Sequence, residues 1–299
     1  MSVQLDLFIH GDRPRLLASL AAALVQPGQL AAVQGMARVL GEANPDDPLL
    51  PALQQLLAAQ AAPPQSGWDA GQLTAWISLL QHDLPLAAAR LLPPHRARQW
   101  LQYRWEELAV TLLPWPWTPA QAELHPAPCW LQAGQWAAAI NAVQRIPNWR
   151  RQATPLSWMA EAQWQLHGTP EAWPALAELA WRAPEALPPL LARLADPELS
   201  RLLQRFQRDF TLENRGADAD SGENPLVWFP AWCLAQDADL APALRPTPTG
   251  PLHDGEKALR LLLELRAAEA QGRHDALLNL SRKLHYLAPE LQGQLRFGE

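Results

Sequence analysis

The sequence has little cysteine and no long apolar run. Cys129 and Cys233 are the only cysteines in 299 residues, and they form no spaced metal-binding or redox pair. A disulfide-stabilised fold is therefore not expected, and a reduced, cytoplasmic protein is the simplest expectation. The start, Met1 to Arg13, lacks a basic segment followed by a long apolar run, so no signal peptide is predicted. The longest apolar stretch near it, Leu16 to Val25, has ten residues and is too short to span a bilayer.

An excess of positive charge is also missing. The chain has 24 Lys and Arg against 30 Asp and Glu, which gives a formal net charge of −6. This balance argues against a general surface for nucleic acid or for an anionic membrane. We therefore expect neither of them among the partners.

No linear motif for catalysis or cofactor binding is present. The chain has no Gly-rich phosphate loop with a lysine, no Gly-x-Ser-x-Gly turn and no His-Glu-x-x-His pair. His125 and Cys129 are four residues apart, but the prolines between them disrupt the helical face that would align two metal ligands. Residues 218–223 have the alternating carboxylates of a calcium loop but lack its distant bidentate glutamate. The sequence predicts a non-enzymatic protein with no catalytic residue, metal or cofactor.

Proline and helix-capping residues are abundant instead. Residue types that cap helices stand directly before a proline at several positions, which include Thr118, Thr154, Thr169, Asp196 and Asn224. Proline suits the first helical position because its missing N–H costs nothing there. Alternating runs of β-branched residues, which would indicate strands, are almost absent. The fold class predicted is all-α, with helices near 14–25, 28–41, 47–60, 69–81, 84–92, 95–112, 119–133 (broken at its prolines), 135–146, 155–167, 170–182, 185–194, 197–211, 225–236, 255–270 and 273–287.

Tryptophan is the second abundant feature. Fifteen Trp stand against two Tyr and five Phe, and eleven of the Trp lie between Trp100 and Trp181. Indoles in such a section either fill a thick helical core or form an exposed aromatic binding surface. Trp130, Trp136 and Trp164 lie at or beside predicted turns, so we expect them to be mostly buried.

One pattern repeats at a fixed distance. Trp130, Gly134 and Ala139 are followed 34 residues later by Trp164, Gly168 and Trp173. A period of this length is typical of chains built from helix–turn–helix units. Similar turns followed five residues later by the packed position of a second helix occur at Gly28 with Val33, Asp83 with Ala88, and Gly272 with Leu277.

These units resemble the tetratricopeptide repeat. The resemblance implies an α-solenoid of stacked antiparallel helix pairs, as one long array or as two smaller bodies. Trp173, Leu277 and Val33 depart from the family, which has a small residue at that position, so the helices there must be wider apart or shifted in register. We predict an N-terminal helical repeat region at 1–112, a Pro/Trp connection at 113–118, and a C-terminal tetratricopeptide-like helical region at 119–299 with a mobile loop near 213–223.

The resemblance also implies a function, which is to bind a protein or peptide partner as an adaptor or scaffold. An all-α enzyme with a site assembled from distant residues is the alternative, and a helical-repeat binder of nucleic acid is a third. The groove positions of the family select five partner-binding residues: Gln132, Trp158, Gln165, Arg266 and Glu269. In this hypothesis a half-exposed Trp158 anchors an apolar side chain and Arg266 holds a carboxylate. The arginines at 201, 205 and 208 form a basic stripe that is either a solvated helix face or a docking face for an acidic segment.

Overall fold

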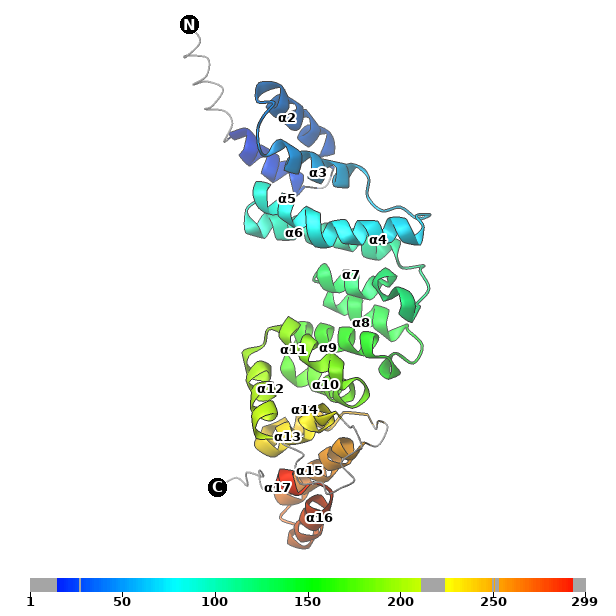
Figure 1. Cartoon of the computed structure of the whole chain (residues 1–299), viewed down its shortest axis with the longest axis vertical. Coiled ribbons are helices and arrows are strands. Elements are labelled where there is room, and N and C mark those ends of the chain that lie inside the picture. Colours follow the sequence, from blue (N-terminus) through cyan, green and yellow to red (C-terminus); the bar gives the residue numbers. More distant parts are fainter. Residues whose placement is uncertain (1–14, 27, 211–223, 249, 251–252, 293–299) are drawn as a thin grey trace. The chain divides into compact units, whose positions relative to one another are not determined.

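A computed structural model of the chain describes residues 15–26, 28–210, 224–248, 250 and 253–292, and Figure 1 shows its course. The described residues are helical with no strand, which confirms the all-α prediction. The chain divides into two compact units after Gln135. The loop predicted near 213–223 lies outside the described residues.

The first unit is a series of helices joined by short turns. After a helix at 15–24 come α2 (Leu30–Ala43), α3 (Leu50–Ala61), α4 (Ala70–Ser78), the π-helix η1 (Leu79–Asp83), α5 (Leu84–Leu91), α6 (Pro94–Thr111), the 3-10 helix η2 (Pro119–Leu124) and α7 (Pro126–Gln132). The predicted connection at 113–118 lies inside this unit. It does not separate two bodies because α6 packs against α7, α4 packs against η2, and Trp115 packs against the core of the unit.

The turn predicted at Asp83 is wrong. Residues 70–91 form one helix, and Asp83 lies in its π-helical segment with φ −86° and ψ −46°. A π-helical turn places one more residue between donor and acceptor than an α-helical turn does. Here the N–H of Leu84 donates to the carbonyl of Leu79. Pro85 follows at once, and its ring would clash with the preceding turn of a regular α-helix. The wider turn lets the helix continue.

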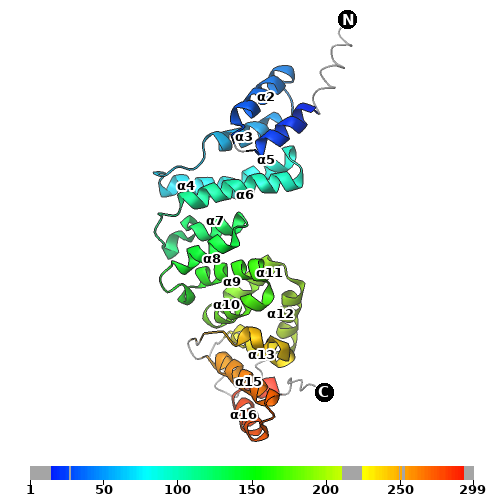
Figure 2. The same cartoon turned by 180° about the vertical axis from the view of Figure 1, so that it is seen from behind.

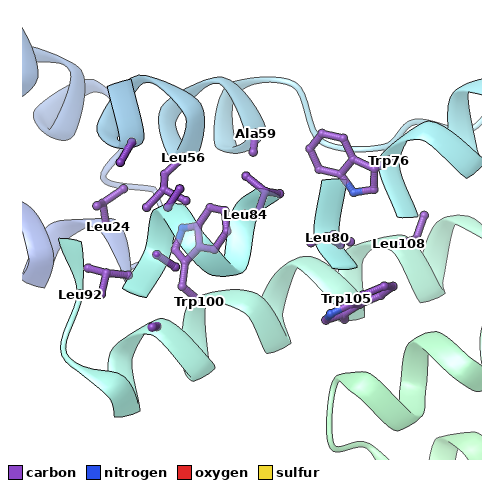
Figure 3. Close-up of a cluster of buried hydrophobic side chains, with 14 of the residues drawn as sticks. Leu24, Leu56, Ala59, Trp76, Leu80, Leu84, Leu92, Trp100, Trp105 and Leu108 are labelled. Carbon is purple, nitrogen blue, oxygen red and sulfur yellow. The ribbon is translucent and has the colours of Figure 1, made fainter. Parts of the chain in front are cut away.

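Leucine and tryptophan side chains fill the first unit. Figure 3 shows Trp100 of α6 among leucines that come from other helices, including Leu24, Leu56 and Leu84. Trp100 is 2% exposed, and the three leucines are also buried. Each helix therefore contributes one apolar face to a shared core, as the spacing of the apolar residues predicts.

The second unit consists of α-helices separated by short 3-10 helices and turns. These are α8 (Trp136–Gln144), η3 (Trp149–Arg151), α9 (Ala153–His167), α10 (Thr169–Arg182), η4 (Pro184–Ala186), α11 (Leu187–Leu194), α12 (Pro197–Asp209), η6 (Pro225–Trp228), α13 (Phe229–Gln236), η7 (Ala238–Leu240), α14 (Ala241–Leu244), α15 (Asp254–Ala270), α16 (His274–Leu287) and α17 (Pro289–Gln292). Helix α9 packs against α8 and α10, and α15 packs against α16 and α13. Both views show α15 and α16 side by side (Figures 1 and 2).

The predicted glycine turns are present at the ends of three helices. Gly134, Gly168 and Gly272 have positive φ angles of 73°, 90° and 65°. At Gly272, the N–H of Arg273 donates to the carbonyl of Ala268 and the N–H of Gly272 to that of Glu269, both at 3.0 Å. These two bonds are the Schellman ending of a helix, which needs a left-handed residue. Glycine at this position ends α15 and starts the turn to α16.

The predicted helix starts are confirmed in part. Asp196 and Asn224 cap α12 and η6 through side-chain acceptance of backbone N–H groups, with proline directly after each. Thr118 precedes η2, and Thr169 is the first residue of α10, but neither side chain caps its helix. Thr154 lies inside α9, which begins one residue earlier with Gln152 as its N-cap.

Aromatic rings also pack the core of the second unit. Trp173, Trp181, Trp228 and Trp232 are fully buried, which supports the core interpretation of the indoles. Phe206 of α12 stacks on Phe210 at 4.9 Å and meets Phe229 and Trp232 edge-on at 5.5 and 5.6 Å between ring centres. Trp130, Trp136 and Trp164, which were expected to be mostly buried, are only partly buried.

A close contact between helices depends on Gly255, in the first turn of α15. A Cβ there would lie 2.2 Å from the carbonyl oxygen of Val227 and 3.2 Å from the Cα of Trp228. Both are backbone atoms and cannot rotate away. We expect Gly255→Ala to destabilise the chain by at least about 2 kcal/mol, measured by urea unfolding followed by circular dichroism.

The matched control is Gly35→Ala in α2, where an added Cβ meets nothing within 4 Å. Alanine is the better helix former, so this variant should gain about 0.5–1 kcal/mol. Equal effects of the two substitutions would contradict the close approach of α15 and η6.

Candidate functional site

A groove of about 800 Å³ lies beside the turn between α9 and α10. We call it the acidic groove and define it by its lining residues: Gln163, His167, Thr169, Pro170, Glu171, Trp173, Pro174, Glu198, Asp239, Leu240, Pro242, Ala243 and Pro246. They come from the end of α9, the start of α10, the first turn of α12, and the segment from η7 to just beyond α14. Helix α14 packs against α10, which brings this last segment to the groove.

The charged side chains that line the acidic groove are all carboxylates. Glu171, Glu198 and Asp239 are exposed, and none of the described lining residues is Lys or Arg. Two of these carboxylates sit in the first turns of α10 and α12, where acidic side chains are favourable because of the helix dipole. Both carboxylates stabilise their own helix starts, and because both are solvent-accessible they can also pair with a positively charged group from outside.

Prolines supply the apolar part of the groove. Pro170, Pro174, Pro242 and Pro246 line it together with Leu240. Proline has almost no side-chain entropy to lose when it is covered. The surface therefore offers rigid apolar contacts between negative charges, and its buried base includes Trp173.

The carboxylate of Asp196 fixes one corner of the groove. It accepts hydrogen bonds from the backbone N–H groups of Glu198 (2.8 Å) and Leu199 (3.1 Å) at the start of α12. It also accepts from Trp164 Nε1 of α9 at 3.1 Å and from Thr169 Oγ1 of α10 at 3.0 Å. Partial burial raises the pKa of Asp196, but these hydrogen bonds outweigh it and hold the pKa below its ordinary value. One carboxylate thus joins three helices.

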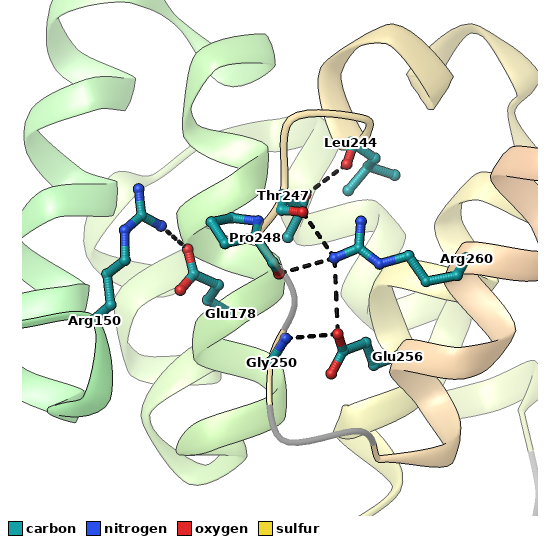
Figure 4. A network of polar contacts seen from close by, with 8 residues as sticks. All are labelled: Arg150, Glu178, Leu244, Thr247, Pro248, Gly250, Glu256 and Arg260. Carbon is teal, nitrogen blue, oxygen red and sulfur yellow. Dashed lines mark hydrogen bonds and ion pairs between the residues drawn. The ribbon is translucent and has the colours of Figure 1, made fainter.

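A polar network holds another side of the groove (Figure 4). Arg260 of α15 donates to the carbonyl oxygens of Thr247 at 2.7 Å and Pro248 at 2.8 Å. Thr247 in turn donates from its hydroxyl to the carbonyl of Leu244 at 2.6 Å. These bonds fix the segment that carries Pro246, and so they set the position of the groove's proline edge.

One buried glutamate belongs to this network, and a second forms a separate ion pair beside it (Figure 4). Glu256 is fully buried, accepts from the N–H of Gly250 at 2.6 Å and lies 3.7 Å from Arg260. Glu178 of α10 is paired with Arg150. Burial raises the pKa of Glu178 and its ion pair with Arg150 lowers it, while the charge of Glu256 raises it further. Both carboxylates are held by arginines within the unit, which is a structural role.

The sequence-predicted binding residues are not brought together in the acidic groove. Gln132 of α7 and Gln165 of α9 are exposed, and their role in binding stays a prediction. Trp158 is 9% exposed, so it is not the half-exposed anchor that was predicted. Arg266 is 7% exposed, and its Nη1 atom is 3.0 Å from the carboxylate of Glu269. An arginine that is buried and paired in this way is not presented to a carboxylate from outside.

One arginine of the basic stripe at 201, 205 and 208 packs against the neighbouring helix α13. Arg205 donates to Gln236 Oε1 of α13 at 2.9 Å, and its guanidinium lies 5.6 Å from the ring centre of Trp232. Arg208 pairs with its exposed neighbour Asp209. Arg201 is exposed. The middle of the stripe therefore connects α12 to α13.

The sequence gives only a weak indication of the residues that line the groove. Thr169-Pro170-Glu171 and Asp196-Pro197-Glu198 are two helix starts of the same type, each with an acidic residue directly after proline. Such a pair marks two carboxylates at helix N-termini but does not show that they meet. Asp239 has no such signal, because η7 and α14 were not predicted.

His125 and Cys129 are structural in the described part of the chain. His125 Nδ1 accepts from the N–H of Ala127 at 3.2 Å and so caps α7, and burial lowers its pKa to about 4. Cys129 is buried in the core of the first unit, where burial raises the pKa of its thiol. Among the described residues, no group of three or more His, Cys, Asp or Glu could hold a metal ion. No helix in the same residues is long and apolar enough to cross a membrane.

The corner built by Asp196 gives a test that depends on pH. In Asp196→Asn an amide N–H replaces one acceptor and faces the donors of Trp164 and Thr169. We expect this to cost about 1–3 kcal/mol at pH 7. Because the folded state lowers the pKa of Asp196, its stabilisation is complete above the ordinary value of 3.8 and is lost as the pH falls through the lower folded pKa. The stability difference should shrink when urea unfolding is repeated below about pH 4.

The control for this substitution is Asp237→Asn. Asp237 is exposed and caps η7 through a backbone bond from Asp239 N at 2.9 Å. Its replacement should cost less than about 1 kcal/mol. Equal costs for the two variants would show that the links to α9 and α10 contribute nothing.

Comparison with known proteins gives no match: no family model, no curated protein and no solved structure matches this chain.

Proposed function

We propose that the chain is a non-enzymatic adaptor whose second unit binds an extended basic segment of a partner protein in the acidic groove. The observation that carries this proposal is the composition of the groove. Three exposed carboxylates lie among rigid prolines, without Lys or Arg among the described lining residues. A basic segment with apolar side chains between its charges matches both properties, and charge complementarity favours it over an acidic one.

The helix arrangement supports the adaptor part of the proposal. The pairs α9–α10 and α15–α16 are helices joined by a turn with a glycine of positive φ, at Gly168 and Gly272. In the tetratricopeptide-like arrangement that we propose, such pairs stack into a solenoid. Solenoids bind extended segments along their surfaces. Fully buried Trp173, at the position where the family has a small residue, would widen the gap between helices beside the groove.

The expected affinity follows from the exposure of the charges. A solvent-exposed ion pair contributes about 0.2–1 kcal/mol, so three pairs strengthen binding by roughly threefold to 150-fold. Salt screens such pairs, since the Debye length is about 8 Å at physiological ionic strength. The proposal therefore implies weak to moderate, salt-dependent binding whose charge part depends on Glu171, Glu198 and Asp239.

The test uses the full chain and a fluorescein-labelled decapeptide in which arginine and leucine alternate. The triple variant Glu171→Gln, Glu198→Gln and Asp239→Asn removes all three charges with little change of shape. We expect it to bind the peptide about tenfold more weakly by fluorescence anisotropy. Wild-type binding should also weaken as sodium chloride is raised from about 50 to about 300 mM.

The matched control changes the same charge elsewhere in the unit. Glu185, Glu264 and Asp275 are exposed and lie outside the acidic groove, so Glu185→Gln, Glu264→Gln and Asp275→Asn should leave affinity within about twofold. Equal weakening in both triple variants would mean that net charge, and not the groove, attracts the peptide. Preference for a glutamate–leucine decapeptide would rule out the basic occupant.

A further inference from the structure

A small cavity in the first unit combines a buried cation with polar atoms that lack partners. It has a volume of about 130 Å³ and lies where the end of the helix at 15–24, the end of α3 and the middle of α6 meet. Its lining residues are Leu24, Val25, Gln26, Gln60, Gln99, Trp100, Tyr103 and Arg104. The acidic groove is in the other unit, so a ligand site in this cavity is independent of the proposed function.

Arg104 brings the positive charge. It is 5% exposed, and its guanidinium lies 4.6 Å from the ring centre of Tyr103 and 5.5 Å from that of Trp100. Its Nη1 atom pairs with Glu107 one turn along α6 at 3.0 Å. Both aromatic rings lie close to the guanidinium, and its contact with Glu107 is an ion pair without a hydrogen bond, because Glu107 Oε2 accepts none within the described part of the chain. The guanidinium therefore keeps N–H donors for an acceptor.

Three buried polar atoms of the lining residues make no hydrogen bond within the described part of the chain. They are Arg104 Nε, Trp100 Nε1 and Gln60 Oε1. Two of the three are N–H donors, and a buried donor without an acceptor is costly. Rotation of the Gln60 amide exchanges its oxygen for its NH₂ group, so this side chain can serve an acceptor or a donor. The lining is therefore rich in donors around one positive charge.

The volume restricts what fits. A cavity needs about 10–15 Å³ of this kind of volume to hold one water, so 130 Å³ admits a group of several heavy atoms. Pockets for drug-sized molecules are larger, at about 300–1,000 Å³. A planar oxyanion has two acceptor oxygens, one for an N–H donor of Arg104 and one for the N–H of Trp100.

We propose that this cavity binds a small free carboxylate, about the size of acetate, through Arg104 Nε, Trp100 Nε1 and the amide of Gln60. The carboxylate supplies acceptors for both N–H groups and a second negative charge for the guanidinium. The aliphatic end of the ligand contacts Leu24 and Val25, which lie on the same lining.

The indole N–H of Trp100 is the direct reporter. In ¹⁵N-labelled full-length protein, its signal is the indole resonance that disappears in Trp100→Phe. Titration with sodium acetate at constant ionic strength should shift this signal saturably, with a dissociation constant of about 0.1–10 mM for a ligand of so few atoms. Acetamide, which has the same shape and no charge, should bind at least about tenfold more weakly.

Two variants separate this site from general anion binding. Arg104→Gln should weaken acetate binding at least about tenfold, while Arg98→Gln, an exposed arginine on the same helix, should not. Since Arg104→Gln can also unfold the unit, Gln99→Glu is the second variant. Gln99 is exposed on the cavity rim, and a carboxylate there either repels acetate or competes with it for Arg104.

The outcomes are distinct. Loss of the saturable shift in Gln99→Glu and in folded Arg104→Gln supports the site. The same shift with sodium chloride or acetamide, or full acetate affinity in both variants, would overturn it. Equal affinity for inorganic phosphate would overturn the carboxylate as the ligand class.

Discussion

The second unit depends on a carboxylate that serves three helices at once. Asp196 caps α12 through two backbone N–H groups, and the same carboxylate accepts from the indole of Trp164 and the hydroxyl of Thr169. A cap alone organises only its own helix. The two additional bonds tie the end of α9 and the start of α10 to that cap, so the turn at Gly168 and the first turn of α12 are held in one arrangement. The acidic groove exists because this corner fixes Glu171 and Glu198 on neighbouring helix starts.

Local signals in the sequence predicted much of the fold. Helix class, most helix positions and the glycine turns follow from rules that involve a few neighbouring residues, such as the Schellman ending at Gly272. The failures occur where distant packing decides. Asp83 was predicted as a turn, but the helix continues through η1 and packs along α3 and α6. The proline-rich stretch at 113–118 was predicted to separate two bodies, whereas Trp115 packs into the core of the first unit.

The candidate site was much less predictable. Its acidic residues lie at positions 171, 198 and 239, and no periodic pattern connects them. Asp239 reaches the groove because α14, which directly follows η7, packs against α10, and a contact between helices so far apart in the chain leaves no local mark on the sequence. Conversely, the positions inferred from the repeat family assumed which face of each helix is open. Trp158 and Arg266 lie on faces that the protein itself covers, because α9 is packed by both α8 and α10 and α15 by both α13 and α16.

The π-helical segment gives the long helix of the first unit a tolerance to changes in chain length. A π turn holds about one residue more than an α turn over the same axial rise. In a variant without Pro85, deletion of one residue between Leu79 and Asp83 would convert the segment to ordinary α-helix, and Trp76 before it and Ala88 after it would keep the faces that they now bury. Elsewhere in a helix the same deletion turns every later side chain by about 100° around the axis and takes it out of the core. Variants of this chain that lack Pro85 and are one residue shorter are therefore accommodated here, and an alignment with such variants should place the single-residue gap at 79–83.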